Sequence, residues 1–105
     1  MKLIELISRL KTIEEADIVL QAELPDTEFD LADIFVEGEL DLDSEVKFFN
    51  AEEIPGTMVF EKDGAKYTNV FPLNMLQEMV EAYASEGLKD DEIGRRVLEY
   101  RFKDA

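Results

Sequence analysis

The chain has 105 residues, 26 of them acidic and 11 basic, a formal net charge of −15, and neither cysteine nor histidine. The missing residue types exclude disulfides, thiolate metal sites and histidine-based catalysis, and the charge disfavours direct contact with nucleic acid or an anionic membrane. Because 46% of the residues are hydrophobic, too many for a disordered acidic chain, we expect a single folded domain over residues 1–105.

The start of the chain has an acidic residue, Glu5, and no long apolar run, which argues against a signal peptide. No stretch reaches the roughly 18 apolar residues that a membrane-spanning helix needs. We therefore expect a cytoplasmic protein.

The negative charge is concentrated in the middle of the chain. Residues 21–61 contain thirteen acidic residues and a single basic residue, Lys47, for a net charge of −12. The flanking segments, residues 1–20 and 62–105, carry net charges of only −1 and −2. The central segment is therefore where we expect an electrostatic interaction with a partner.

The first residues are predicted to form an amphipathic helix, because apolar side chains recur at helical spacing. These residues are Leu3, Leu6, Ile7, Leu10 and Ile13. Thr12 and Glu15 form a capping box that predicts the start of a second helix, and Pro25 marks its end. A single longer helix is the alternative.

Apolar and charged residues alternate from Val36 to Phe48, which predicts a strand with one buried face. A turn at Asp43–Ser44 would divide it into two strands. The odd positions place a row of acidic side chains on the other face: Glu37, Glu39, Asp41, Asp43 and Glu45. On a strand these neighbours repel one another, and a basic partner would relieve that repulsion. A merely solvated strand face is the alternative interpretation.

Asp63-Gly64, between two apolar runs at 57–60 and 67–71, predicts a β-hairpin. The remaining residues predict two helices separated by Gly87, with Ile93, Val97, Leu98 and Tyr100 facing inward in the second. The expected fold class is α+β: an N-terminal helical segment, an antiparallel meander of three to four strands within residues 34–71, and a C-terminal helical hairpin.

Two motifs are incomplete. Asp41, Asp43, Glu45 and Glu52 match ligand positions of an EF-hand loop, but Val46 stands where that loop needs glycine. Residues 83–98 have the pattern of the first two helices of a helix-turn-helix, but no recognition helix follows. The sequence therefore predicts no metal site, no cofactor and no DNA-binding motif.

Adjacent aromatic residues pose a packing question. Phe48 and Phe49 point to opposite faces of a strand, and the same holds for Ile34 and Phe35. We expect core packing with helices on both sides of the sheet; the alternative is an exposed patch that binds a partner or a second copy.

The leading functional hypothesis is a non-enzymatic interaction domain, of inhibitor, immunity or adaptor type, that binds a basic protein partner through the acidic row 37–45. One alternative is a small-molecule-binding or weakly equipped enzymatic domain with a site between the sheet and the C-terminal helices. Its first polar candidates are Arg95, Arg96 and Tyr100. A structural homo-oligomer, such as a homodimer, is the other alternative.

Overall fold

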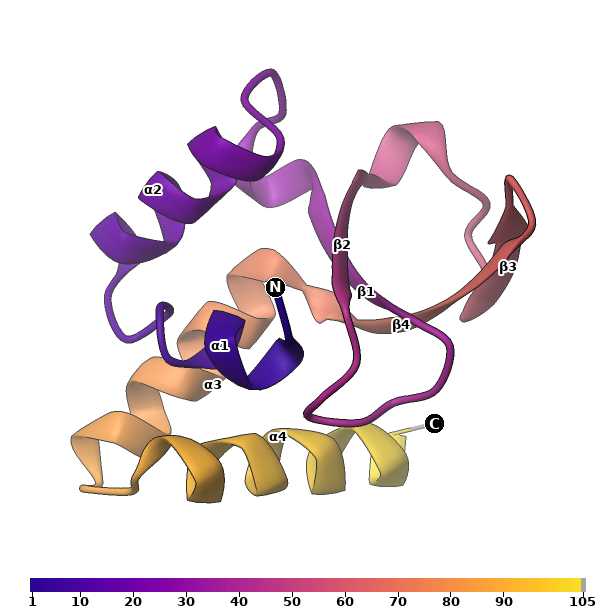
Figure 1. Cartoon of the computed structure of the whole chain (residues 1–105). Helices are drawn as coiled ribbons and strands as arrows, with labels where there is room; N and C mark the ends of the chain where they lie inside the picture. The colour runs from indigo at the N-terminus through magenta and orange to yellow at the C-terminus, as the bar shows by residue number, and fades with distance from the viewer. Residues whose placement is uncertain (105) are drawn as a thin grey trace.

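The computed structural model describes residues 1–104 and confirms the α+β fold class, with helices at both ends of the chain and a four-stranded antiparallel sheet between them (Figure 1). The helices are α1 (Leu3–Ile7), α2 (Ile13–Glu23), α3 (Leu73–Ser85) and α4 (Asp90–Asp104), with short 3₁₀ helices η1 (Phe29–Leu31) and η2 (Ala51–Glu53). The strands are β1 (Ala32–Glu37), β2 (Val46–Asn50), β3 (Val59–Lys62) and β4 (Ala65–Pro72). Within the described residues, no helix has the length and apolar character needed to cross a membrane.

The N-terminal segment forms two helices, not one. The Thr12 hydroxyl accepts a hydrogen bond from the Glu15 backbone N–H at 3.2 Å, so the predicted cap is confirmed. Because this cap starts a new helix, Ile13 does not continue the apolar stripe of the first helix. It becomes the first residue of α2, and its side chain is 54% exposed.

The strand order is β2-β1-β4-β3, so the sheet consists of two hairpins joined through β1 and β4 instead of strands paired in sequential order. The β3–β4 hairpin turns at Asp63 and Gly64, which have φ angles of 53° and 82°. Positive φ at both central residues is the geometry of a type I′ turn, as the Asp-Gly pair predicts.

The strand predicted from Val36 to Phe48 is wrong in its middle part. β1 ends at Glu37 and β2 begins at Val46, and residues 38–45 form a loop. In its middle part the backbone of this loop bonds to the first helix: Ile4 N–H donates to the Leu42 carbonyl, and Leu3 N–H to that of Ser44, both at 3.0 Å. Only the two ends of the loop bond to strands, through Gly38 N–H to the Lys66 carbonyl of β4 and Glu37 N–H of β1 to the Glu45 carbonyl. The alternation still describes burial, because the loop lies against the helices with its acidic side chains outward.

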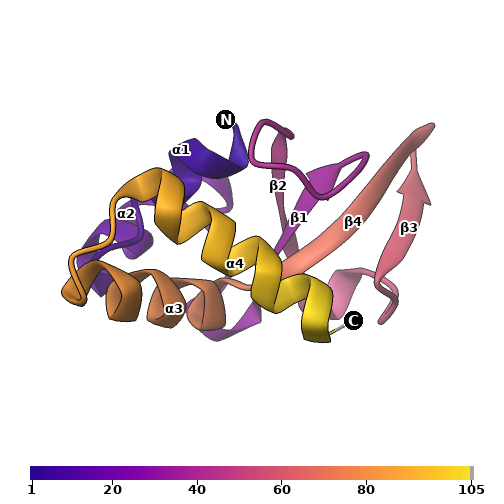
Figure 2. The same cartoon turned by 90° about the horizontal axis from the view of Figure 1, so that it is seen from below.

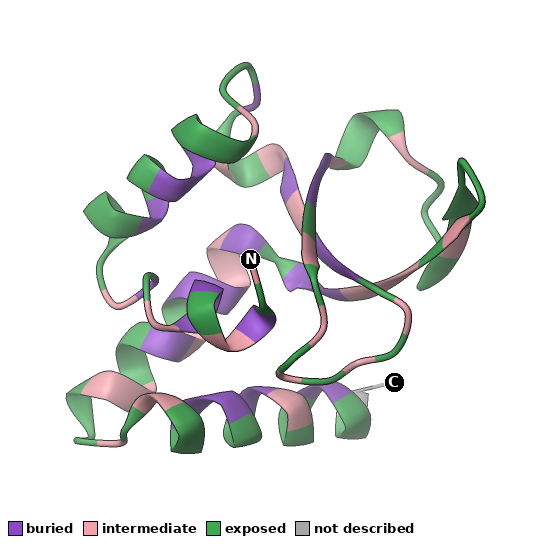
Figure 3. Cartoon of the chain, viewed as in Figure 1, coloured by how far each residue is buried: buried purple, intermediate pink, exposed green. Residues whose placement is uncertain are grey.

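The helices cover one face of the sheet and leave the other uncovered by helix (Figure 2). The helix-facing core includes Ile34, Val36 and Phe48, together with the inner sides of the four helices, and these buried stretches are drawn purple in Figure 3. The expectation that helices cover both faces is therefore wrong.

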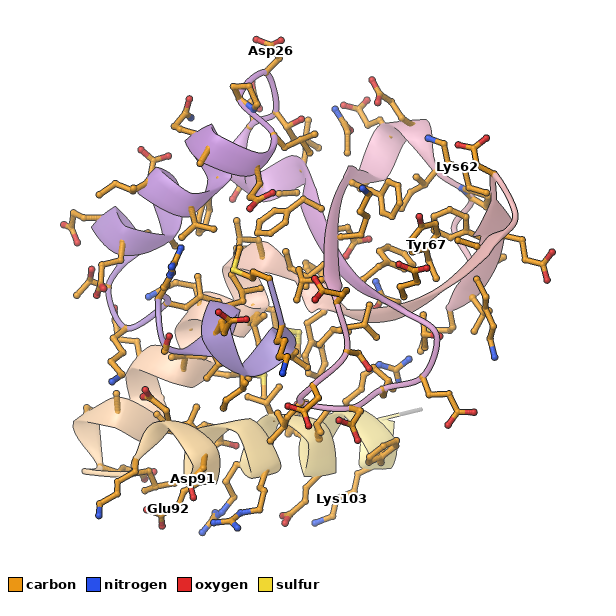
Figure 4. The ribbon with its side chains drawn as sticks, viewed as in Figure 1. Asp26, Lys62, Tyr67, Asp91, Glu92 and Lys103 are labelled. Atoms are coloured by element: carbon orange, nitrogen blue, oxygen red, sulfur yellow. The ribbon has the colours of Figure 1, made fainter. Side chains whose placement is uncertain are left out.

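The second face is closed by the curl of the sheet itself. Four rings pack edge-on or tilted against one another, with centroids 5.1 to 5.6 Å apart: Phe35, Phe49, Phe60 and Tyr67. Figure 4 shows Tyr67 inside this curl, with Lys62 at its edge. Phe48 and Phe49 do point to opposite faces, and both are buried. The aromatic cluster is the second layer that the adjacent rings require.

The C-terminal helical hairpin is confirmed. Gly87, with a φ of 87°, lies between α3 and α4 and supplies the left-handed residue that commonly ends a helix. The buried side of α4 contains Ile93, Gly94, Val97 and Arg101. This face places α4 against α1 and against the loop between β1 and β2.

Candidate functional site

The acidic row predicted on a strand lies on a loop. We call residues 37–45 the acidic loop. Glu37 is the last residue of β1, and its N–H donates to the Glu45 carbonyl at 2.8 Å, which closes the base of the loop. All five predicted acidic side chains are exposed: Glu37, Glu39, Asp41, Asp43 and Glu45. The prediction that these five side chains face solvent is confirmed, although most of them lie on a loop and not on the predicted strand.

Two leucines of the acidic loop, Leu40 and Leu42, pack against the core and anchor the loop to the body of the protein. Leu42 packs into a space above Gly94 of α4, where a Cβ atom on residue 94 would come within 2.8 Å of Leu42 Cδ2. The same Cβ would lie 3.2 Å from Ile4 Cδ1 of α1. The lack of a side chain at Gly94 therefore gives the loop its seat between α1 and α4.

Two of the five acids already have a cation. The N-terminal ammonium lies 2.9 Å from Glu45 Oε2, and Lys2 Nζ lies 3.9 Å from Asp43 Oδ1. The hydrogen bond to Glu45 raises the pKa of the Met1 amino group above its usual value, and burial opposes this effect. Among the described residues, Glu39 has no cationic group within 4.0 Å, and the same holds for Glu37 and Asp41.

A third glutamate joins the base of the loop. Glu23, from the end of α2, lines a hollow of about 340 Å³ with Glu37 and Glu45. Sequence reasoning missed Glu23 because it lies on a different element. These acids do not converge on a cation site, since among the side chains that the structure describes no group of three acids has the geometry to hold a metal ion. Glu52, the last partial EF-hand position, follows β2 and is separated from Glu45 by the whole strand.

The polar residues proposed for the alternative site lie on the outside of α4. Arg95 and Arg96 are exposed, and Arg95 forms a long ion pair of 3.6 Å with Asp91 one turn earlier. The prediction that Tyr100 faces inward is wrong: the residue is 45% exposed, with its ring 5.8 Å from that of Phe71. These three side chains therefore lie on the solvent-exposed side of α4, away from the buried side that faces the core.

The arginine that points inward is Arg101, which is only 4% exposed. Its Nε donates to the Asn69 carbonyl at 3.1 Å, and its Nη2 lies 3.7 Å from Met58 Sδ. No carboxylate of the described residues lies within 4.0 Å of its guanidinium. The helical spacing 93–97–101 could have identified it, but a charged residue is not expected on an apolar stripe.

Asn69, whose carbonyl accepts the hydrogen bond from Arg101, also contacts Asp33 of β1 through its side chain. Its side-chain N–H donates to Asp33 Oδ1 at 3.2 Å, next to the irregularity in the β1–β4 register at Ile34 and Phe35. Burial raises the pKa of Asp33, and the hydrogen bond from Asn69 partly offsets this rise. Because these contacts satisfy backbone and side-chain groups where the ladder is interrupted, they fix the register of β4.

Comparison with protein-family models, curated proteins and solved structures finds no match for this chain. Function therefore has to be inferred from the charges, contacts and surfaces of the molecule itself.

Proposed function

We propose that the protein is a non-enzymatic interaction domain that binds a basic protein partner through the acidic loop, as an inhibitor, immunity protein or adaptor does. The observation that supports this most is the outward placement of all five acidic side chains on a loop that the core holds in place. Between Lys11 and Lys47 the chain contains no basic residue, so the segment that includes the loop contributes only negative charge.

A fixed acidic surface favours fast association with a basic partner and selects against acidic ones. The acids without a cation of their own, including Glu39 and Asp41, gain most from such a partner because nothing in the described chain neutralises them. The chemical inventory agrees with a binding role, since the chain has neither histidine nor cysteine to serve as base or nucleophile. A cytoplasmic location belongs to the same proposal and is supported by the lack of disulfides.

The test is a charge-reversal comparison at constant net charge. One variant carries Glu39→Lys, Asp41→Lys and Asp43→Lys. The matched control carries lysine at three exposed acids: Glu78 of α3, Glu86 directly after α3, and Glu99 of α4. Basic proteins captured from native lysate by the wild type are measured against both variants at low and high salt. We expect the loop variant to lose about tenfold or more in affinity at low salt, and the control much less. Equal losses in the two variants, or binding that ignores salt, would contradict the proposal.

A homo-oligomer is the second candidate function, favoured by one exposed apolar area. Phe102 at the end of α4 is 59% exposed, and it lines a hollow of about 280 Å³ together with Val59 of the edge strand β3. The net charge of −15 opposes self-association, and this opposition weakens with salt. Light scattering at high protein concentration and high salt tests it: a monomer under those conditions rejects this candidate.

A further inference from the structure

A second acidic surface lies on α2, outside the acidic loop. Two hollows of about 340 and 420 Å³ adjoin there and share Asp17 and Phe29. They form one depression between α2 and the segment that leads into η1, which we call the α2 groove. Its lining includes Ile13, Glu14, Asp17, Leu20, Asp26 and Phe29.

The floor of the α2 groove is apolar and partly open. Ile13 is 54% exposed because the Thr12 cap makes it the first residue of a new helix. Phe29, brought alongside by η1, is half-buried, and Leu20 is fully buried beneath. An isoleucine and a phenylalanine that both contact water at one depression favour a partner whose apolar side chains cover them.

The rim of the α2 groove is acidic without internal compensation. Glu14, Asp17 and Asp26 are exposed, and no cationic group of the described residues lies within 4.0 Å of them. Figure 4 shows Asp26 at the outer end of the turn that follows α2. The nearest basic residue before the helix, Lys11, is held by Asp90 of α4 at 2.7 Å. The groove therefore combines uncovered apolar side chains with unneutralised negative charge.

We propose that the α2 groove is the docking site for a basic amphipathic helix of a protein partner. Apolar side chains on one face of that helix cover Ile13 and Phe29, and flanking lysines or arginines meet Glu14, Asp17 and Asp26. Helix-in-groove binding suits this place because α2 has 11 residues, or about 16 Å of length, beside which three turns of a partner helix can lie. The inference rests on the proposed function in one respect only, that the partner is basic.

The test uses a labelled helical peptide of about 18 residues made of leucine and lysine, with leucine at helical spacing. A scrambled peptide of the same composition measures charge alone, and a leucine–glutamate peptide of the same pattern measures apolar contact alone. The protein variants are Asp17→Lys, Asp17→Asn and Ile13→Gln. Their matched controls are Asp41→Lys in the acidic loop and Ile18→Gln, on α2 but outside the groove lining and 70% exposed. Circular dichroism of each variant verifies the fold.

We expect the amphipathic peptide to bind about tenfold tighter than the scrambled one. Asp17→Lys and Ile13→Gln each weaken it about tenfold, Asp17→Asn less, and the two controls by less than about threefold. Equal binding of the two lysine peptides, or equal effects of Ile13→Gln and Ile18→Gln, overturns the inference. Self-association that Asp17→Lys abolishes also overturns it, because the occupant is then a second copy.

The outcome is separable from that of the proposed function. If the groove variants bind the peptide normally while the triple loop variant loses its captured partner, this inference fails and the proposed function stands. If the peptide binds at the groove while the captured partner ignores the triple loop variant, the acidic loop is the wrong surface and the groove remains.

Discussion

The acidic loop and the α2 groove are both rich in carboxylates, but they differ in their nearby cations and in their contacts with the core. The loop is bonded to the core through Leu42, and two of its acids lie near cations from the first two residues. The groove acids have no such cation among the described residues, and the apolar side chains beside them remain partly open to water. The densest acidic stretch of the sequence is thus partly neutralised within the fold, whereas a less dense one is not.

This difference bears on how an acidic surface should be interpreted. Charge that the fold neutralises contributes to its own stability, while unneutralised charge next to exposed apolar area costs stability and gains most from a partner. The following variants either break this contrast or sharpen it, from the largest expected effect to the smallest.

Leu42→Ala should lower the free energy of unfolding by about 2 kcal/mol, because it empties the seat between α1 and α4 that fixes the loop. Ile18→Ala on α2 is the matched control and should change it by less than about 0.5 kcal/mol, because that side chain is 70% exposed. Urea titration measures both. Similar values for the two variants would mean that the loop is not anchored as described.

Gly94→Ala should destabilise by about 1 kcal/mol through crowding of Leu42, although the same change in an open helix gains about 1 kcal/mol. The sign should reverse in the Leu42→Ala background, where both Leu42 Cδ atoms are gone and only Ile4 Cδ1, at 3.2 Å, stays close to the new Cβ. A double-mutant cycle by urea unfolding checks this coupling. Additive effects would show that Gly94 and Leu42 do not share one space.

Neutralising a single acid should change the free energy of unfolding in opposite directions in the two regions. Glu45→Gln removes an exposed ion pair with the amino terminus and should cost about 0.5 kcal/mol. Asp17→Asn removes repulsion from Glu14, one turn away on the same helix, and should gain about 0.3 kcal/mol. Thermal unfolding at low and high salt tests both. High salt should reduce both stability changes. If both variants were stabilised, or both destabilised, the two regions would not differ as described.

The smallest expected effect is a pH dependence of the loop. The pKa of the Met1 amino group is raised above 8.0 in the folded chain, mainly by its hydrogen bond to Glu45. The folded state therefore binds this proton more tightly than the unfolded state, so the contribution is complete below pH 8.0 and is lost as the pH rises through the folded pKa. The difference in unfolding free energy between wild type and Glu45→Gln should shrink over that range. A difference that stays constant would contradict the ion pair.

Local signals in the sequence predicted much of the fold. The Thr12 cap, the Asp63-Gly64 turn and the break at Gly87 each depend on a few neighbouring residues, and each is confirmed. The alternation around the acidic loop predicted burial but not hydrogen bonding. An alternation with a period of two is expected for any extended segment that has one side against a core, whether or not it belongs to a sheet. The hydrogen-bond partner of the Leu42 carbonyl in this loop is the N–H of Ile4, which is distant in the sequence.

The sites depended on contacts that the sequence does not show. Arg101 follows Ile93 and Val97 at helical spacing, but a charged residue is not expected on a buried helix face, so the sequence alone favours Arg95 and Arg96 as site residues. Its burial becomes understandable only with the Asn69 carbonyl in place. The α2 groove likewise exists only because η1 brings Phe29 beside Ile13. Long-range placement of this kind is what single-sequence periodicity cannot supply.

The most direct test of the acidic-surface account is a chemical-shift map of the isotope-labelled chain with the amphipathic leucine–lysine peptide, recorded at low and high salt. The account predicts shifts within residues 13–30, around the α2 groove, that disappear at high salt and are absent with the leucine–glutamate peptide. Shifts concentrated on α3 and α4 or on the aromatic cluster, or shifts that salt leaves unchanged, would contradict it.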